Sequence, residues 1–224
     1  MGNKTLILGD GLLGSEFKKQ TDWSIHSRRT GFDIQNIEKT IGYIPDTIVN
    51  CIAHTDTYDQ ERDTHWNVNY KFVSDLVDFC NHYDVKLVHI STDYLYTYSK
   101  ENASETDVPV HCGTWYGYTK LLADGHVQLK SSNYLLIRAT HKPKPFPYDN
   151  AWIDQVGNFD YVDNIVNLMV KLISKNECGV YNVGTELKTM YDLAKKTKNV
   201  KPIHITNNTP TDVSLNIDKL NMIL

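Results

Sequence analysis

The fold is decided by the stretch Thr5-Leu6-Ile7-Leu8-Gly9-Asp10-Gly11-Leu12-Leu13-Gly14. Its first four residues form a wholly apolar run, typical of a strand buried in a parallel sheet, and a helical pattern begins at Ser15. Glycines between strand and helix allow a tight turn that approaches a pyrophosphate, while the helix N-terminus supplies free N–H donors. This strand, turn and helix predict a dinucleotide-binding fold.

Further apolar segments repeat this alternation along the chain. We expect strands at 23–27, 47–53, 85–90 and 180–183, with helices over about 64–82, from 115 onward and over 191–196. We expect two sets of apolar residues to face the core at helical spacing: Trp66, Phe72, Leu76 and Phe79, and Ile165, Leu168, Met169 and Leu172. The order predicts an α/β fold of the Rossmann type, a doubly wound parallel sheet.

The second predicted strand ends where a dinucleotide fold holds the adenosine ribose. The acidic residue that binds a ribose 2′-hydroxyl is absent there, and Ser27-Arg28-Arg29 stands in its place. A pair of guanidinium groups suits a 2′-phosphate better than a bare hydroxyl. The sequence therefore favours NADP(H), with NAD(H) as the alternative cofactor; solvated loop charges are the other interpretation of these arginines.

Tyr116 and Lys120 lie near the start of a predicted helix, and their spacing places both side chains on one face. A free phenol has a pKa of about 10, and lowering it by roughly three units needs about 4 kcal/mol. A unit charge about 4 Å away, at an effective dielectric constant near 20, supplies about that much. One lysine is therefore enough to make Tyr116 a proton donor.

The surroundings decide which Tyr-x-x-x-Lys pair matters, because the spacing also occurs at Tyr96/Lys100 and Tyr191/Lys195. The predicted strand 85–90 ends in Ser91-Thr92-Asp93-Tyr94. Ligands of doubly wound sheets bind outside the carboxyl ends of strands, so Thr92 either donates to a substrate oxygen or caps the strand end. Tyr116 begins the next helix, which favours it over the other two tyrosines.

Composition argues against several classes of protein. The net charge of −4 and a pI near 6.1 oppose a nucleic-acid surface. We find no signal peptide and no apolar run of about 18 residues, and therefore expect a cytoplasmic protein without a membrane partner. Cys51, Cys80, Cys112 and Cys178 fit reduced thiols, and the nine histidines form no zinc spacing. We therefore predict no structural metal.

Several segments together resemble the extended short-chain dehydrogenase/reductase family, and within it the dTDP-4-dehydrorhamnose reductase group. They are Asn50-Cys51-Ile52-Ala53, Asn67-Val68-Asn69, Ser91-Thr92-Asp93-Tyr94-Leu95-Tyr96, Trp115-Tyr116-Gly117-Tyr118-Thr119-Lys120-Leu121, Asp154-Gln155-Val156-Gly157, Tyr161-Val162-Asp163, Gly179-Val180-Tyr181-Asn182-Val183-Gly184 and Leu215-Asn216-Ile217-Asp218-Lys219-Leu220. The resemblance implies an oxidoreductase of dTDP-rhamnose and polysaccharide biosynthesis. Tyr116 would protonate a ketone oxygen, Thr92 would polarise it, and Lys120 would bind the nicotinamide ribose.

From the residues and the resemblance together we expect two groups of binding residues. The cofactor group is Gly9, Asp10, Gly11, Leu12, Leu13, Gly14, Ser27, Arg28, Arg29, Asp33, Ile34, Cys51, Ile52, Ala53, Asn69 and Lys120, with a surface amide as the alternative for Asn69. The substrate group is Thr92, Asp93, Tyr94, Tyr116, Lys142 and Trp152. Similar dehydratases carry Asp-Glu after the threonine, and Asp93-Tyr94 here favours carbonyl reduction over dehydration.

The chain departs from the family pattern at three places. Its glycine motif, G-x-G-x-x-G, is one residue tighter than the usual G-x-x-G-x-x-G, and Thr209-Pro210 stands where relatives commonly have Arg-Pro. A Pro-rich connector from Arg138 to Trp152 replaces a substrate-domain helix. Lys142 and Lys144 in this connector either contact a diphosphate or are solvated. The C-terminal substrate cap is therefore expected to be reduced.

The sequence thus predicts an NAD(P)-binding Rossmann core over 1–138. A small substrate-binding cap over 139–224 is interleaved with the last strand and helices of the core. We expect NADP(H)-dependent reduction of a nucleotide-linked 4-keto-6-deoxy sugar, and the sequence allows a homodimer. Two alternatives stay open: a non-catalytic NADP-binding regulatory subunit and a nucleotide-sugar epimerase.

Overall fold

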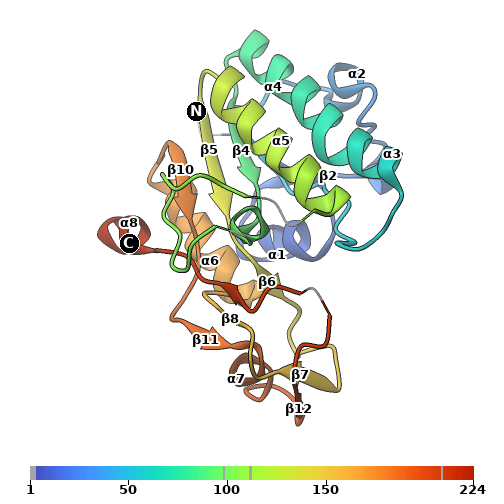
Figure 1. Cartoon of the computed structure of the whole chain (residues 1–224). Helices are drawn as coiled ribbons and strands as arrows, with labels where there is room; N and C mark the ends of the chain where they lie inside the picture. Colours follow the sequence, from blue (N-terminus) through green and yellow to red (C-terminus); the bar gives the residue numbers. More distant parts are fainter. Residues whose placement is uncertain (1–3, 98, 111–112, 208) are drawn as a thin grey trace.

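A computed structural model describes residues 4–97, 99–110, 113–207 and 209–224 (Figure 1). Its centre is a six-stranded sheet in the order β10-β5-β4-β3-β1-β2, in which every neighbouring pair runs parallel. The strands are β1 (Thr5–Leu8), β2 (Ser24–His26), β3 (Thr47–Asn50), β4 (Lys86–Ile90), β5 (Tyr134–Arg138) and β10 (Gly179–Asn182). The predicted Rossmann-type parallel sheet is therefore confirmed.

Helices cover both faces of the sheet and create two hydrophobic cores (Figure 1). One face packs against α2 (Ile37–Ile41), α4 (Phe72–Tyr83) and α5 (Trp115–Lys130). The other packs against α1 (Leu12–Gln20), α6 (Val162–Ser174) and α8 (Asp218–Ile223). Burial on both faces explains why β1, β3 and β4 are uninterrupted buried runs.

The first turn has the close backbone contacts that require glycine. Gly9 has a φ of 98°, in the region that disfavours other residues. A Cβ placed on Gly14 would lie 1.9 Å from the Gly9 carbonyl oxygen, so α1 can start this close to β1 only without a side chain there. The predicted strand-glycine-helix unit is thus built as expected.

A second long helical run follows β3, and here one core prediction was wrong. The run consists of α3 (Arg62–His65), the π-helical η2 (Trp66–Lys71) and α4. Phe72, Leu76 and Phe79 are buried, but Trp66 is 39% exposed. Trp66 precedes Phe72 by six residues, which is not a whole number of turns in an α-helix or in a π-helix, so the two side chains leave the helical run on different sides.

The C-terminal part adds a small cap built mainly of short strands (Figure 1). The 139–151 connector contains no helix. The described part of the cap has two two-stranded sheets and one three-stranded sheet, and in each of them a strand from further along the chain completes the pairing. The cap elements are β6 (His141–Lys142) with β9 (Asp160–Tyr161), β7 (Asn150–Trp152) with β12 (Lys201–Ile203), β8 (Val156–Gly157) with β11 (Lys188–Thr189) and β13 (Asp212–Val213), and α7 (Met190–Ala194).

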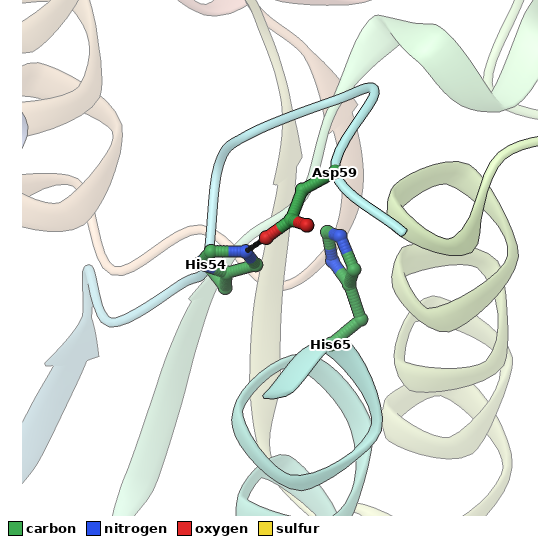
Figure 2. A group of neighbouring side chains, drawn as sticks. All are labelled: His54, Asp59 and His65. Atoms are coloured by element: carbon green, nitrogen blue, oxygen red, sulfur yellow. Dashed lines mark hydrogen bonds and ion pairs between the residues drawn. The ribbon is translucent and has the colours of Figure 1, made fainter. Parts of the chain in front are cut away.

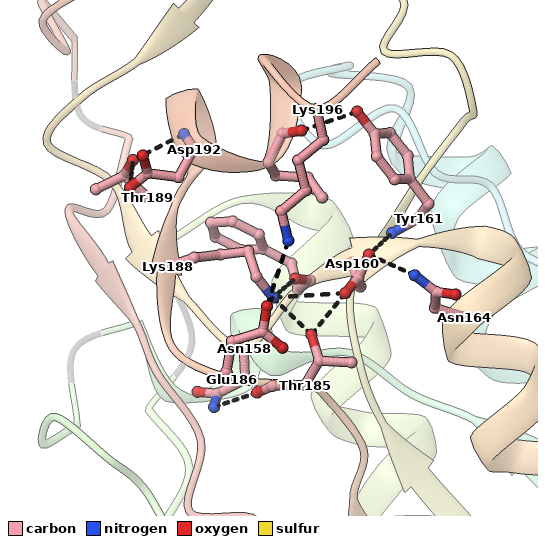
Figure 3. A network of polar contacts seen from close by, with 12 residues as sticks. Asn158, Asp160, Tyr161, Asn164, Thr185, Glu186, Lys188, Thr189, Asp192 and Lys196 are labelled. Atoms are coloured by element: carbon pink, nitrogen blue, oxygen red, sulfur yellow. Dashed lines mark hydrogen bonds and ion pairs between the residues drawn. The ribbon is translucent and has the colours of Figure 1, made fainter.

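A buried lysine joins the cap to the core (Figure 3). Lys188 Nζ donates to the Phe159 carbonyl oxygen at 3.1 Å and to Thr185 Oγ1 at 2.6 Å, and it lies 3.5 Å from Asp160 Oδ2. The other oxygen of Asp160 accepts from Asn164 Nδ2 at 3.0 Å, in the first turn of α6. This network therefore connects β11 of the cap with a core helix.

Two 3₁₀ turns complete the elements, η1 (Arg28–Thr30) and η3 (Asp93–Tyr96). Among the described residues, no helix is both long and apolar enough to cross a membrane.

Candidate active site

The glycine turn lies where the strand order changes direction, which is the ligand-binding edge of a doubly wound sheet. β1 has β2 on one side and β3 on the other. The Cys51 N–H donates to the Leu8 carbonyl oxygen at 2.9 Å, and a Cβ on Gly9 would lie 3.0 Å from Ile52 Cγ1. The structure thus brings two predicted cofactor segments together, 9–14 and 51–53.

The turn is also open on its outer side. A Cβ on Gly11 would meet no heavy atom within 4 Å of the described chain, and no side chain caps the N-terminus of α1. Among the described residues no side chain therefore caps the N–H groups at the start of this nine-residue helix, and an anion suits such a helix start. The residues present fit a bound pyrophosphate.

The predicted ribose corner lies beside this turn. The Gly9 N–H donates to the His26 carbonyl oxygen at 2.8 Å, which fixes the end of β2 next to it. Ser27 caps η1, and Arg29 Nη1 lies 3.4 Å from Asp10 Oδ2 with its side chain 83% exposed. Asp33 and Ile34 follow at the same edge, with the Asp33 pKa lowered by the Gln35 N–H and the Asn36 amide.

Tyr116 and Lys120 both come from the first turns of α5, whose start is capped by Thr114 Oγ1 at 3.0 Å from the Gly117 N–H. The Lys120 side chain is buried, and its Nζ donates to the Ile90 carbonyl oxygen at 2.7 Å. Burial lowers the pKa of Lys120 to about 8, while the carboxylate of Asp124 opposes that shift. An ammonium is thus held at the end of β4.

The Tyr116 ring lies among residues that surround the carboxyl end of β4. Its centroid is 6.3 Å from that of Tyr94 and 6.4 Å from that of His65. Thr92, two residues before Tyr94, is buried and accepts the Tyr94 N–H at 3.2 Å. The structure therefore brings the predicted tyrosine, lysine and threonine to one edge of the sheet.

The Thr92 hydroxyl is hydrogen-bonded to the carboxylate of Asp93, a contact that the sequence did not predict. Thr92 Oγ1 donates to Asp93 Oδ1 at 3.3 Å, and Thr140 donates to the same oxygen. Burial raises the pKa of Asp93, with Thr140 and the ammonium of Lys142 acting in the opposite direction. Asp93 and Lys142, both predicted to contact substrate, are thus electrostatic neighbours.

α5 is held in place by a buried ion pair, which the sequence did not reveal. Arg138 Nη2 lies 2.7 Å from Asp124 Oδ1 and Arg138 Nε 3.0 Å from Asp124 Oδ2, and both side chains are about 98% buried or more. Ser91 Oγ also donates to Asp124 at 2.8 Å. Since Asp124 is one turn beyond Lys120, this pair fixes the helix that carries Tyr116.

Asn69 is buried, so the surface-amide alternative is excluded. Its Oδ1 accepts the His54 N–H at 2.8 Å and its Nδ2 donates to the His54 carbonyl oxygen at 3.0 Å. Asn69 thus holds the loop that follows Ala53. Whether it also contacts a cofactor stays a prediction.

The connector carries two residues for which contacts with substrate were considered, Lys144 and Trp152. Lys144 is exposed and pairs with Asp163 at 2.6 Å, as expected for a solvated surface charge. Trp152 packs half-buried against the hydrophobic core of the cap, in β7, which Figure 1 shows well away from α5. The structure therefore does not place Trp152 beside Tyr116 or Thr92.

Cys51, Cys80 and Cys178 are free thiols, and Cys112 lies outside the described residues. Burial raises the pKa of the Cys51 thiol well above its usual value, opposed by Lys120. Cys51 therefore stays a neutral thiol near neutral pH, and its contact with a cofactor remains a prediction.

The described residues combine a Rossmann-type parallel sheet, a glycine turn where the strand order changes direction, and a Tyr-Lys pair in the first turns of α5. Residues 3–141 match the family model described as the RmlD substrate binding domain, and the chain belongs to this family. No match was found among curated proteins.

Solved structures share the whole fold at low sequence identity. A dTDP-4-dehydrorhamnose reductase from Bacillus anthracis, in complex with NADP, has a TM-score of 0.83 and 21% identity, covering 99% of this chain and 93% of that chain. A dTDP-4-dehydrorhamnose reductase from Clostridium acetobutylicum has a TM-score of 0.80 and 22% identity, covering 95% and 89%. A UDP-glucuronic acid 4-epimerase from Bacillus cereus, in complex with NAD, has a TM-score of 0.76 and 20% identity, covering 99% and 90%.

Proposed function

We propose that this protein is an NADP(H)-dependent reductase of a nucleotide-linked 4-keto-6-deoxy sugar, similar to dTDP-4-dehydrorhamnose reductase. The observation that carries the proposal is the convergence of Tyr116, Lys120 and Thr92 at the sheet edge that also holds the glycine turn. Membership of the RmlD family and similarity to an NADP-bound reductase support it.

Each residue has a defined chemical part in this proposal. When bound, NADPH supplies the hydride. Tyr116 Oη transfers its proton to the ketone oxygen, and the Lys120 ammonium stabilises the resulting phenolate. The Thr92 hydroxyl turns from Asp93 to the same ketone oxygen, where it stabilises the developing negative charge.

Cofactor choice is proposed from the ribose corner. Arg28 and Arg29 are exposed next to the glycine turn, and no acidic side chain follows β2 directly. Two guanidinium groups bind a 2′-phosphate through charge-assisted hydrogen bonds. NADP(H) is therefore the preferred cofactor, with NAD(H) as the weaker one.

The main alternative is epimerisation, in which hydride returns to the same sugar; the similarity to NAD-bound UDP-glucuronic acid 4-epimerase favours it. It predicts conversion without net consumption of NADPH.

A non-catalytic NADP-binding subunit is the other alternative, because the Lys120 ammonium and the Thr92 hydroxyl both bond to the protein itself. It predicts NADPH binding without turnover.

The test measures NADPH oxidation by the full chain with a dTDP-4-keto-6-deoxyhexose. Tyr116→Phe removes only the hydroxyl, and we expect it to lower the rate at least 100-fold while NADPH still binds. Tyr118→Phe is the matched control, since Tyr118 is on the same helix and 37% exposed, and it should keep the wild-type rate. Equal rates for wild type and Tyr116→Phe would contradict the proposal.

The cytoplasmic location and the homodimer stay predictions.

A further inference from the structure

Three side chains with metal-binding atoms converge beside the candidate active site, outside its predicted residues. His54 and Asp59 lie in the loop after β3, and His65 is in α3 (Figure 2). His54 Nε2 is 2.8 Å from Asp59 Oδ2, and one ligand atom from each of the three residues lies within 4.8 Å of the others. Figure 2 shows the three side chains pointing toward one another.

His65 provides an independent indication that something binds there. It is completely buried, and its Nε2 has no hydrogen-bond partner of normal geometry within the described part of the chain, although the Asp59 backbone lies near the ring. A buried N–H or lone pair without a partner costs about 1–3 kcal/mol, so such a group calls for an explanation. A ligand between His65 and the His54–Asp59 pair would satisfy it.

The second ring nitrogen of His65 does not prevent this. His65 Nδ1 is 3.3 Å from Asn69 Nδ2, which is also 3.0 Å from the His54 carbonyl oxygen and 3.4 Å from Thr119 Oγ1. An amide nitrogen has two protons for these three acceptors. Metal binding through Nε2 moves the ring proton to Nδ1, where it faces the Asn69 amide nitrogen, which cannot accept it. Asn69 can direct both its protons to the other two acceptors, so the cost of metal binding here is one unpaired Nδ1–H.

We propose that His54, Asp59 and His65 bind one divalent transition-metal ion, with Zn²⁺ as the best match. Two imidazole nitrogens and one carboxylate oxygen form a donor set typical of zinc, whereas Mg²⁺ and Ca²⁺ take oxygen ligands. Zinc bonds of about 2.0–2.2 Å require tetrahedral ligand atoms roughly 3.3 Å apart. The present ligand atoms lie up to 4.8 Å apart, so metal binding requires the longest separation to shorten by about 1.5 Å.

The site also has an entry path and an open position. The side chains of His54 and Asp59 are each 27% exposed, so an ion can reach them from solvent. The buried His65 would then bind the ion on its inner side. On binding, the proton between His54 Nε2 and Asp59 leaves Nε2, either to His54 Nδ1 or to solvent. Three protein ligands leave a fourth position for water.

The position of the site suggests a consequence for the neighbouring tyrosine. The ring of His65 lies 6.4 Å from that of Tyr116, and the metal would tie the 54–59 loop to α3. Metal binding should therefore stiffen the 54–59 loop and the start of α3, whose His65 ring contacts Tyr116. The binding itself is independent of which reaction Tyr116 performs.

The test is calorimetric titration of Zn²⁺ into the chelator-treated full chain, with Co²⁺ absorption as a second readout of the ligands. We expect one zinc ion per chain and a Zn²⁺-dependent rise in melting temperature. Asp59→Asn, which keeps the side-chain size at a partly exposed position, should weaken zinc binding at least tenfold. His54→Gln is the second variant and should do the same.

His204→Asn is the matched control. His204 Nδ1 lies 3.0 Å from Asp154 Oδ2, which is also a His–Asp pair but is outside the three-residue cluster. His204→Asn should bind zinc as the wild type does. The proposal is overturned if the wild type binds no zinc, or if Asp59→Asn and His54→Gln, shown to be folded by circular dichroism, bind it with wild-type affinity. Equal weakening by His204→Asn would also overturn it, since the ion would then be bound adventitiously.

Discussion

Replacing Lys120 by methionine is expected to change how the stability of the protein depends on pH. Lys120 is 2% exposed, and burial lowers its pKa from 10.5 to about 8. A shift of that size means that holding the ammonium charged costs the folded state about 3 kcal/mol below pH 8. Lys120→Met removes this cost and, in return, leaves the Ile90 carbonyl oxygen without its partner, which costs about 1–3 kcal/mol.

The sign of the pH effect follows from the lowered pKa. Between about pH 8 and pH 10.5 the unfolded chain holds the Lys120 proton more firmly than the folded one, so wild-type stability rises with pH. Lys120→Met lacks this contribution. At about pH 7 we expect the variant to be as stable as the wild type or more so, and by about pH 10 the wild type should gain about 2 kcal/mol relative to it.

The assay is urea unfolding of both proteins, followed by tryptophan fluorescence at the two pH values. Other titrating groups are common to both proteins, so the difference between their free energies of unfolding isolates Lys120. A difference that is the same at both pH values would refute the reasoning, because it would mean that Lys120 titrates normally in the folded state.

Two further predictions concern cofactor choice and the support of α5. Arg29→Ser should weaken NADPH binding about tenfold or more and leave NADH binding nearly unchanged, measured by fluorescence titration; equal effects on both cofactors would place Arg29 away from the 2′-phosphate. Arg138→Met should lower the free energy of unfolding by about 3–5 kcal/mol, because the buried Asp124 carboxylate loses its partner. Urea unfolding checks this, and the double variant Arg138→Met/Asp124→Leu should be less damaged; a double variant no better than the single one would contradict the ion-pair account.

The parallel sheet was predictable because each strand has a local signature. β1, β3 and β4 are buried on both faces, so their apolar runs are unbroken in the sequence. The glycine turn was predictable for a similar reason, since Gly9 needs a positive φ and Gly14 has no room for a Cβ. Both constraints act between residues close together in the chain.

Contacts between distant residues were not predictable in this way. The pairing of Arg138 with Asp124 depends on how α5 lies against β5, and the sequence contains no spacing rule for it. The same is true of His54, Asp59 and His65, which a loop brings together without any zinc-type spacing. Trp66 is exposed although it is apolar and lies in a helical run, because its distance from Phe72 turns its side chain away from the core.

The central claim is that Tyr116 protonates a ketone while hydride arrives from NADPH, and isotope transfer tests it most directly. The full chain is incubated with a dTDP-4-keto-6-deoxyhexose and NADPH deuterated at the transferred position, and the sugar product is analysed by NMR. We predict one deuterium at the former ketone carbon for each NADPH consumed, and almost none with Tyr116→Phe. A sugar product without deuterium, or equal labelling by the two proteins, would contradict the claim.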